Sequence, residues 1–137
     1  MPHLIVEYSA NIESEIVLDE LLDKLRDSAL AAKIFPIGGL RVRAQRTDHY
    51  RVADCDPANG FVHMTVFVGH GRPLDVLERA GQQLFDTLTT HLDELYRQGQ
   101  LAISLNMQEF HPQLNFKKNN LHRYLSAKRA NTDSADE

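Results

Sequence analysis

The sequence predicts an α+β fold in which two strand–helix–strand units share one four-stranded mixed sheet, with two helices on one face. The chain follows the same plan twice, over about residues 2–47 and 61–110: an apolar strand, a helical pattern and a second strand. An echo between His3-Leu4-Ile5-Val6 and His63-Met64-Thr65-Val66, at equivalent points of the two units, indicates duplication. By length, a chain of 137 residues makes one domain.

The first unit begins with the apolar run Leu4-Ile5-Val6. It passes into a helical pattern from about Ser14 to Ala32, in which leucine and isoleucine recur at the spacing of one helix face. Gly38-Gly39 then breaks the chain. From Leu40 to Thr47 apolar and polar side chains alternate, and this period of two predicts a strand.

The second unit repeats this order. Phe61 to Val68 predicts a strand and Gly69-His70-Gly71 a tight turn. Pro73 marks the first turn of a helix that continues to Gly99, because proline is favoured where the helix has no use for its missing N–H. Leu101 to Phe110 predicts the closing strand, and Asp54 to Gly60 is the loop that joins the two units.

After the second unit, Asn115 to Tyr124 predicts a short helix or arm, and the polar segment 126–137 is expected to be a disordered tail. The predicted domain therefore covers residues 1–125. Right-handed crossovers place both helices on one face of the sheet and leave the other face bare. Because a bare apolar sheet face needs a cover in water, we expect a homo-oligomer.

The composition is that of a soluble globular protein, with 42% hydrophobic and 25% charged residues. No apolar run approaches the ~20 residues of a membrane span, and no signal peptide precedes the first strand. We therefore expect a cytoplasmic protein with no membrane partner. The net charge of -4 argues against a nucleic-acid partner. Cys55 is the single cysteine and the seven histidines are scattered, so we expect no metal site.

Pro2 is the most informative single residue. A small second residue lets an aminopeptidase remove Met1, which leaves a free secondary amine at the start of a strand. Apolar walls and nearby cations would disfavour the protonated amine, lower its pKa towards neutrality and let it carry protons at pH 7. A trimmed proline terminus can equally be inert, so Pro2 alone does not decide between these interpretations.

Four segments over positions 1 to about 124 carry a specific resemblance. They are Met1-Pro2-His3-Leu4-Ile5-Val6-Glu7, Ile34-Phe35-Pro36-Ile37-Gly38-Gly39-Leu40-Arg41-Val42-Arg43, Phe61-Val62-His63-Met64-Thr65 with Gly69-His70-Gly71-Arg72, and His111-Pro112-Gln113-Leu114-Asn115-Phe116-Lys117-Lys118-Asn119-Asn120. Together they resemble the tautomerase superfamily and, more closely, the 5-carboxymethyl-2-hydroxymuconate Δ-isomerase family.

The resemblance implies an isomerase (tautomerase) without a cofactor, in the bacterial aromatic catabolism of homoprotocatechuate. Its substrate, 5-carboxymethyl-2-hydroxymuconate, belongs to the unsaturated 2-hydroxy dicarboxylates and tricarboxylates, and the product is the 2-oxo isomer. Pro2 would be the general acid/base, and the matching arginines, which bind substrate and assist catalysis, fall on Arg41 and Arg72. Family members of this length resemble homotrimers of fused repeats.

Physical chemistry makes the two arginines plausible ligands for such a substrate. A planar guanidinium binds a carboxylate through two hydrogen bonds and stays charged at any working pH. Arg41 opens a strand after Gly38-Gly39, and Arg72 precedes a helix start, where the helix dipole favours anions. Their charges would also lower the pKa of the Pro2 amine. His70, beside Arg72, is a further candidate for contact with the substrate.

Other polar residues are expected to have structural roles. Solvent-exposed positions are expected for Arg46 and Arg51. Arg43 shares a strand face with Arg41 and could assist it, but an exposed strand arginine is the preferred interpretation. His3 and His63 occupy equivalent strand positions and are expected to form hydrogen bonds within the sheet. Phe116 is equally well interpreted as an apolar lid or as a contact of the terminal arm with a neighbouring subunit.

Two alternative functions stay open. A non-catalytic ferredoxin-like binding or assembly module would use the same sheet face and leave Pro2 without a role. A tautomerase with a different substrate would keep the Pro2 chemistry. Nucleophilic catalysis is disfavoured, because Asp54 and Asp56 would raise the pKa of the Cys55 thiol and no Gly-x-Ser-x-Gly motif is present.

Overall fold

The computed structural model of the chain describes residues 1–135. The strands are β1 His3–Ser9, β2 Arg41–Thr47, β3 Asn59–Val68 and β4 Gln100–Glu109. The α-helices are α1 Glu13–Ile16, α2 Leu18–Ala31, α3 Leu74–His91, α4 Asp93–Gln98 and α5 Leu121–Ala135, and two 3₁₀ helices are η1 Ala10–Ile12 and η2 Ile37–Gly39.

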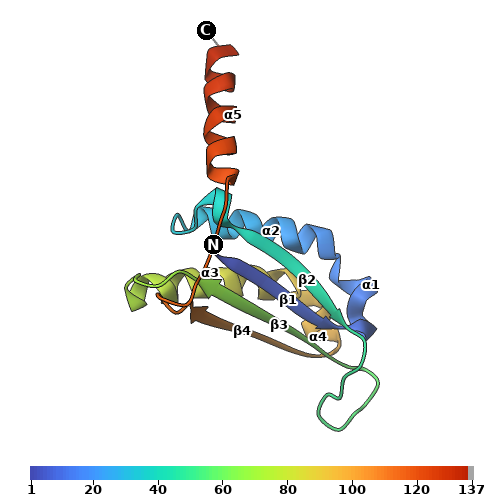
Figure 1. Cartoon of the computed structure of the whole chain (residues 1–137). Helices are drawn as coiled ribbons and strands as arrows, with labels where there is room; N and C mark the ends of the chain where they lie inside the picture. The colour runs from blue at the N-terminus through green and yellow to red at the C-terminus, as the bar shows by residue number, and fades with distance from the viewer. Residues whose placement is uncertain (136–137) are drawn as a thin grey trace.

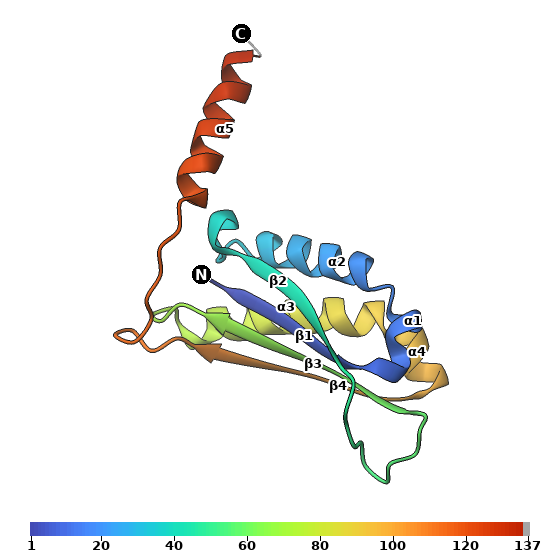
Figure 2. The same cartoon turned by 45° about the vertical axis from the view of Figure 1, so that its right-hand side comes forward.

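The four strands form one sheet in the order β2-β1-β3-β4. β1 pairs in parallel with β2 and β3 in parallel with β4, whereas the two central strands, β1 and β3, are antiparallel. The helices α2 and α3 lie side by side on one face (Figures 1 and 2). The predicted fold class, two fused β-α-β units with a four-stranded mixed sheet, is confirmed.

The core fills the space between the sheet and the two long helices. Every second residue of the central strands points into it, and the helices contribute side chains at the spacing of one helix face. Its members include Leu4, Val6, Leu21, Leu25, Met64, Val66, Leu84 and Leu88, none with measurable exposure. Burial of each such side chain stabilises the fold by about 1.5–3 kcal/mol.

The first predicted helix, Ser14 to Ala32, is interrupted. α1 ends at Ile16, Val17 takes the left-handed conformation (φ 52°, ψ 65°), and α2 begins at Leu18. The core explains the break, because Ile16 and Leu21 are both buried. Five residues of continuous helix would place them about 140° apart. The second predicted helix is also divided, because α3 ends at His91 and α4 begins at Asp93, but Leu92 between them is not left-handed (φ -93°, ψ 5°).

The face of the sheet away from the helices is not the apolar surface that the sequence suggested. Alternation along the strands brings Ile5, Phe61 and Phe67 to this face together with charged and polar side chains. His3 and His63 form hydrogen bonds within the sheet, as expected from the sequence. The Arg43 Nη1 to His3 Nδ1 distance is 2.9 Å, and His63 Nδ1 lies 2.7 Å from Ser104 Oγ. A guanidinium only donates, so the His3 ring accepts through Nδ1.

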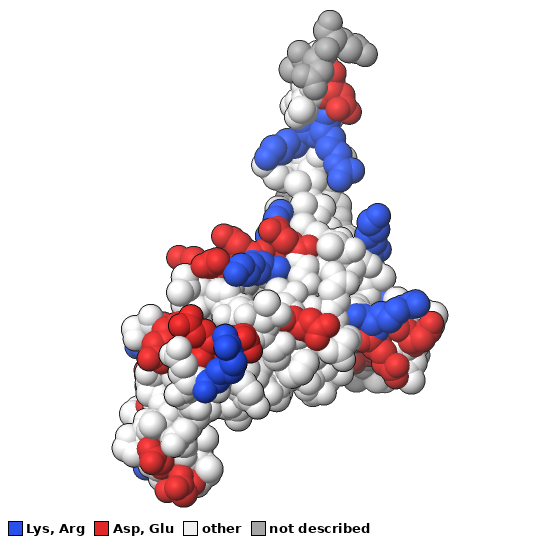
Figure 3. All heavy atoms as spheres, turned by 180° about the vertical axis from the view of Figure 1, so that it is seen from behind, with Lys and Arg blue, Asp and Glu red and all other residues white. Residues whose placement is uncertain are grey.

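The disordered tail predicted for 126–137 is wrong as far as Ala135, because α5 continues through it. No glycine or proline interrupts Leu121–Ala135, and its leucine, alanine, lysine and arginine residues favour helix. α5 projects from the body and contacts η2 (Figures 1 and 2). Lys and Arg side chains lie on its surface (Figure 3). Residues 136–137 lie outside the described part of the chain.

Within residues 1–135, the helices are all too short or too polar to cross a membrane.

Candidate active site

The amino terminus lies at the head of a central strand, at the edge of the sheet where β2 begins and β3 and β4 end (Figures 1 and 2). Pro2 is buried, and its carbonyl accepts a hydrogen bond from the Arg41 backbone N–H (3.0 Å). Gly39 passes so close that a Cβ at this position would lie 3.3 Å from Pro2 Cδ. The Gly38-Gly39 break therefore lets η2 pack directly over the proline.

Arg41 extends from the start of β2 towards the terminal residue. Its Nη1 donates to the carbonyl oxygens of Gly38 (3.2 Å) and Leu40 (3.1 Å), and its Nη2 lies 3.6 Å from Met1 Sδ. The guanidinium is half-buried and faces the residue whose removal would expose the Pro2 nitrogen.

Arg72 reaches the same region from the second unit. Gly71, at φ 112°, supplies the left-handed turn that directs the chain from β3 into α3, a conformation that favours glycine. The Arg72 Nη2 donates to the Ile34 carbonyl (2.6 Å) and its Nη1 to the Gly69 carbonyl (3.3 Å). Its guanidinium carbon lies 6.0 Å from the ring centroid of Phe35, which is buried. Arg72 is thereby tied to the segment that follows α2.

Neither arginine is neutralised by a carboxylate. Over residues 1–135, Arg41 and Arg72 donate to backbone carbonyls and form no ion pair. Carbonyl oxygens fix the guanidinium planes without cancelling their charges. The edge of the sheet at the amino terminus therefore carries positive charge that is available to an anion.

This positive charge affects the pKa of the terminal amine. Burial lowers the pKa of the Met1 amine below its usual value of 8.0, and the charges of Lys117, Arg41 and Arg72 lower it further. Both arginines chosen from the sequence thus lie near enough to the chain terminus to act on its amine. Lys117 is a cation that the sequence argument did not single out, although it falls within the segment 111–120 that carries the family resemblance.

The segment 111–120 crosses back from β4 towards η2. The Asn119 side chain donates from Nδ2 to the Gly38 carbonyl (2.8 Å) and accepts from the Leu121 N–H through Oδ1 (2.9 Å), where α5 begins. The His122 ring packs on Gly38 so tightly that a Cβ there would clash with it. Gly38 O consequently receives hydrogen bonds from both Asn119 and Arg41.

An aromatic group flanks the amino terminus on the uncovered face. Phe67 and Phe110 stack with centroids 5.5 Å apart, and the His3 ring meets Phe110 edge-on at 6.0 Å. Burial and the Arg43 charge lower the pKa of His3 below its usual 6.5, so His3 is neutral at pH 7. These rings provide an apolar border next to the cations.

His70 lies at the same edge but faces an acid. Its side chain is 59% exposed, and Nδ1 is 3.5 Å from Glu109 Oε2, which also accepts from the Gly71 N–H (3.2 Å). The proposed contact between His70 and substrate stays a prediction. Phe116, considered as a lid, is 86% exposed, so its ring is not packed in the described part of the chain.

The comparisons with known proteins agree with one another. The sequence profile described as 5-carboxymethyl-2-hydroxymuconate isomerase matches residues 2–125. The 5-carboxymethyl-2-hydroxymuconate Delta-isomerase of Escherichia coli is 42% identical over 122 residues, which cover 89% of this chain and 97% of that protein.

Solved structures give the same result. A 5-carboxymethyl-2-hydroxymuconate isomerase from Deinococcus radiodurans R1 superposes with a TM-score of 0.85 at 40% identity, over 90% of this chain and 93% of that one. A fused 4-OT symmetric trimer matches at a TM-score of 0.55 and 17% identity, over 78% of this chain and 85% of that one, a likeness of fold alone.

Proposed function

The chain belongs to the 5-carboxymethyl-2-hydroxymuconate isomerase family, and on that premise we propose that it converts 5-carboxymethyl-2-hydroxymuconate into its 2-oxo isomer, with Pro2 as general acid/base. The observation that carries the proposal is the convergence of Lys117, Arg41 and Arg72 on the terminal amine. A binding module with an incidental proline would have no need for such an arrangement. The non-catalytic alternative is therefore the weaker one.

The proposed reaction moves one proton and needs no net redox change. Removal of Met1 frees the Pro2 nitrogen, which takes the proton of the 2-hydroxyl group. The O–H electrons form the 2-oxo group, the C2=C3 bond becomes C3=C4, and the electrons of C4=C5 take up a proton at C5. Proton transfer by a positioned base typically contributes about 10²–10⁴-fold to the rate.

Arg41 and Arg72 have two roles in this scheme. Each guanidinium binds a substrate carboxylate, and together they stabilise the negative charge of the dienolate. The same charges would lower the pKa of the Pro2 amine towards neutrality, because an ammonium beside them is disfavoured. Substrate binding and base activation thus depend on one set of side chains.

We extend the proposal to a cytoplasmic homotrimer in homoprotocatechuate catabolism, as the family resemblance implies. The uncovered sheet face carries Ile5, Phe61 and Phe67 beside charged and polar side chains, so a neighbouring copy could cover apolar groups and form hydrogen bonds there. Light scattering measures the mass of the assembly, and a monomer at enzyme-assay concentrations would contradict the trimer.

The direct test is an ultraviolet assay on 5-carboxymethyl-2-hydroxymuconate, with intact mass confirming that Met1 is absent. We expect Pro2→Ala to lower kcat by about 10²-fold or more, while circular dichroism shows an unchanged fold. Chemically acetylated wild-type enzyme should lose activity to a similar extent. If an acetylated or Met1-retaining enzyme worked as well as the processed one, Pro2 would not be the base.

A further inference from the structure

We propose that Lys117, held by the terminal arm, binds the third carboxylate of the substrate and makes the enzyme selective for a tricarboxylate over a dicarboxylate. This inference rests on the proposed function. It assigns a specificity-determining residue that the sequence argument passed over.

The substrate has one more charge than the two arginines can match. Muconate is a dicarboxylate, and the carboxymethyl substituent adds a third carboxylate to the same molecule. Arg41 and Arg72 supply two cations, and both are free of carboxylate partners within residues 1–135. A third cation at this edge of the sheet would complete the charge balance. Arg43 is engaged with the His3 ring (2.9 Å), whereas Lys117 lies with Arg41 and Arg72 among the cations close to the terminal amine.

A hydrogen bond from the Asn119 side chain fixes the backbone close to Lys117. Asn119, two residues later, donates to the Gly38 carbonyl, which also accepts from Arg41. Two residues of extended chain span at most about 7 Å, so the hydrogen bond from Asn119 to Gly38 keeps Lys117 close to η2. The neighbouring Gly39 packs against Pro2 and Met1. The arm therefore brings the lysine to the terminus from a position more than one hundred residues away in sequence.

The three cations differ in rigidity, and this difference suits them to different carboxylates of the substrate. The two guanidinium groups are held in place by backbone carbonyls, which suits the carboxylates of a rigid, conjugated chain. Lys117 is exposed and carries a compact ammonium on a flexible stem. A flexible stem suits a carboxylate that is itself attached through a CH₂ group. We therefore assign Lys117 to the carboxymethyl carboxylate.

Lys118 provides the matched control. It is the next residue in the same segment and is also exposed, but it lines a hollow with Asn119, Asn120 and Arg123 at the start of α5. It is not among the cations that act on the terminal amine. Replacement of either lysine removes one positive charge from the arm, so a general loss of attraction for anions would affect both variants equally.

The experiment measures binding without turnover. Calorimetry on wild type, Lys117→Ala and Lys118→Ala uses pentane-1,2,5-tricarboxylate, a saturated analogue of the substrate skeleton, and hexanedioate, which lacks the carboxymethyl group. Hydrogen bonds to charged groups lead us to expect a roughly 10-fold rise in the tricarboxylate Kd for Lys117→Ala. For hexanedioate the rise should stay below about 2-fold, and Lys118→Ala should change neither Kd appreciably.

Equal losses for the two ligands, or equal losses in the two variants, would overturn the assignment. Since neither analogue can be isomerised, the result does not depend on Pro2. An inactive Lys117→Ala enzyme with normal tricarboxylate binding would therefore refute this inference and leave the proton-transfer proposal intact. A fully active Pro2→Ala enzyme would do the reverse.

Discussion

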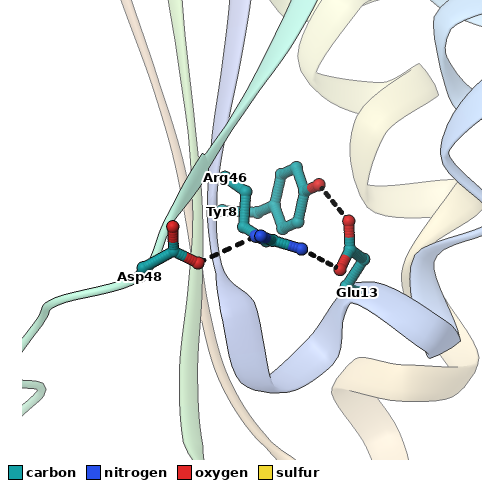
Figure 4. A network of polar contacts seen from close by, with 4 residues as sticks. All are labelled: Tyr8, Glu13, Arg46 and Asp48. Atoms are coloured by element: carbon teal, nitrogen blue, oxygen red, sulfur yellow. Dashed lines mark hydrogen bonds and ion pairs between the residues drawn. The ribbon is translucent and has the colours of Figure 1, made fainter.

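The two ends of strand β2 contain arginines in opposite electrostatic situations. Arg41, at the start, donates to backbone carbonyls and keeps its charge. Arg46, near the end, is paired with two carboxylates: Nη1 lies 2.7 Å from Glu13 Oε2 and Nε 2.8 Å from Asp48 Oδ1. Figure 4 shows this network, in which the Tyr8 hydroxyl also donates to Glu13 Oε1 (3.0 Å).

The pKa shifts of Glu13, Arg46 and Tyr8 follow from their contacts with one another. Hydrogen bonds from Arg46 and Tyr8 lower the pKa of Glu13, and Glu13 and Asp48 raise that of Arg46. Burial and the bond to Glu13 raise the pKa of Tyr8. At the other end of the sheet the cations instead lower the pKa of an amine. Identical side chains are thus neutralised where they meet carboxylates and keep their charge where they meet carbonyls.

The largest effect is expected from a pair of variants that each lose one arginine, Arg72 at the amino-terminal site and Arg46 at the paired end of β2. We expect Arg72→Ala to lower kcat/KM by about 10²-fold, mainly through KM, because a charge that meets the substrate is lost. Arg46→Ala, which removes the same group from the paired end, should leave kcat/KM within about 2-fold of wild type. Steady-state kinetics measure kcat/KM for both variants. A comparable loss of kcat/KM in both would show that the difference between the free and the paired arginine has no effect on function.

The pH dependence tests the same comparison through the terminal amine. The neutral amine is the active base, so kcat/KM should fall as the pH drops below its pKa in the free enzyme. The cations lower the pKa of the Met1 amine and should act on the Pro2 amine in the same way, and Arg72→Gln removes one of them. The acid limb of the kcat/KM profile should therefore move to higher pH in Arg72→Gln and stay in place in Arg46→Gln. A limb at the same pH in all three enzymes would contradict this reasoning.

The smallest effect is expected at the paired end. The pKa of Glu13 is lower in the folded chain than its usual 4.5, so its ionised form stabilises the fold above that pH, and the contribution is lost as the pH falls through the folded pKa. Glu13→Gln should cause a small fall in Tm at pH 7 that disappears under more acidic conditions. Isomerase activity at pH 7 should be unchanged. Thermal scans at several pH values measure the difference in Tm between wild type and Glu13→Gln. A Tm shift that persists at low pH would show that the ion pair between Glu13 and Arg46 is not its source.

Much of the site could be predicted because its signals are local. Pro2, Arg41 and Arg72 lie next to glycine breaks or strand starts, where a short window of sequence indicates an element boundary. Lys117 gave no such signal, since its relation to the terminal amine depends on the arm and on the Asn119 to Gly38 hydrogen bond. Arg46 is exposed as expected, but the sequence argument did not foresee its ion pairs with Glu13 and Asp48.

By itself, the sequence determined the four strands, the two β-α-β units and the family, because hydrophobic period and short motifs are properties of neighbouring residues. Tertiary structure decided the break at Val17, the course of α5 and the convergence of Lys117 with Arg41 and Arg72 on the terminal amine. Packing and long-range hydrogen bonds join residues that are distant in the chain. No local pattern encodes which of those residues meet.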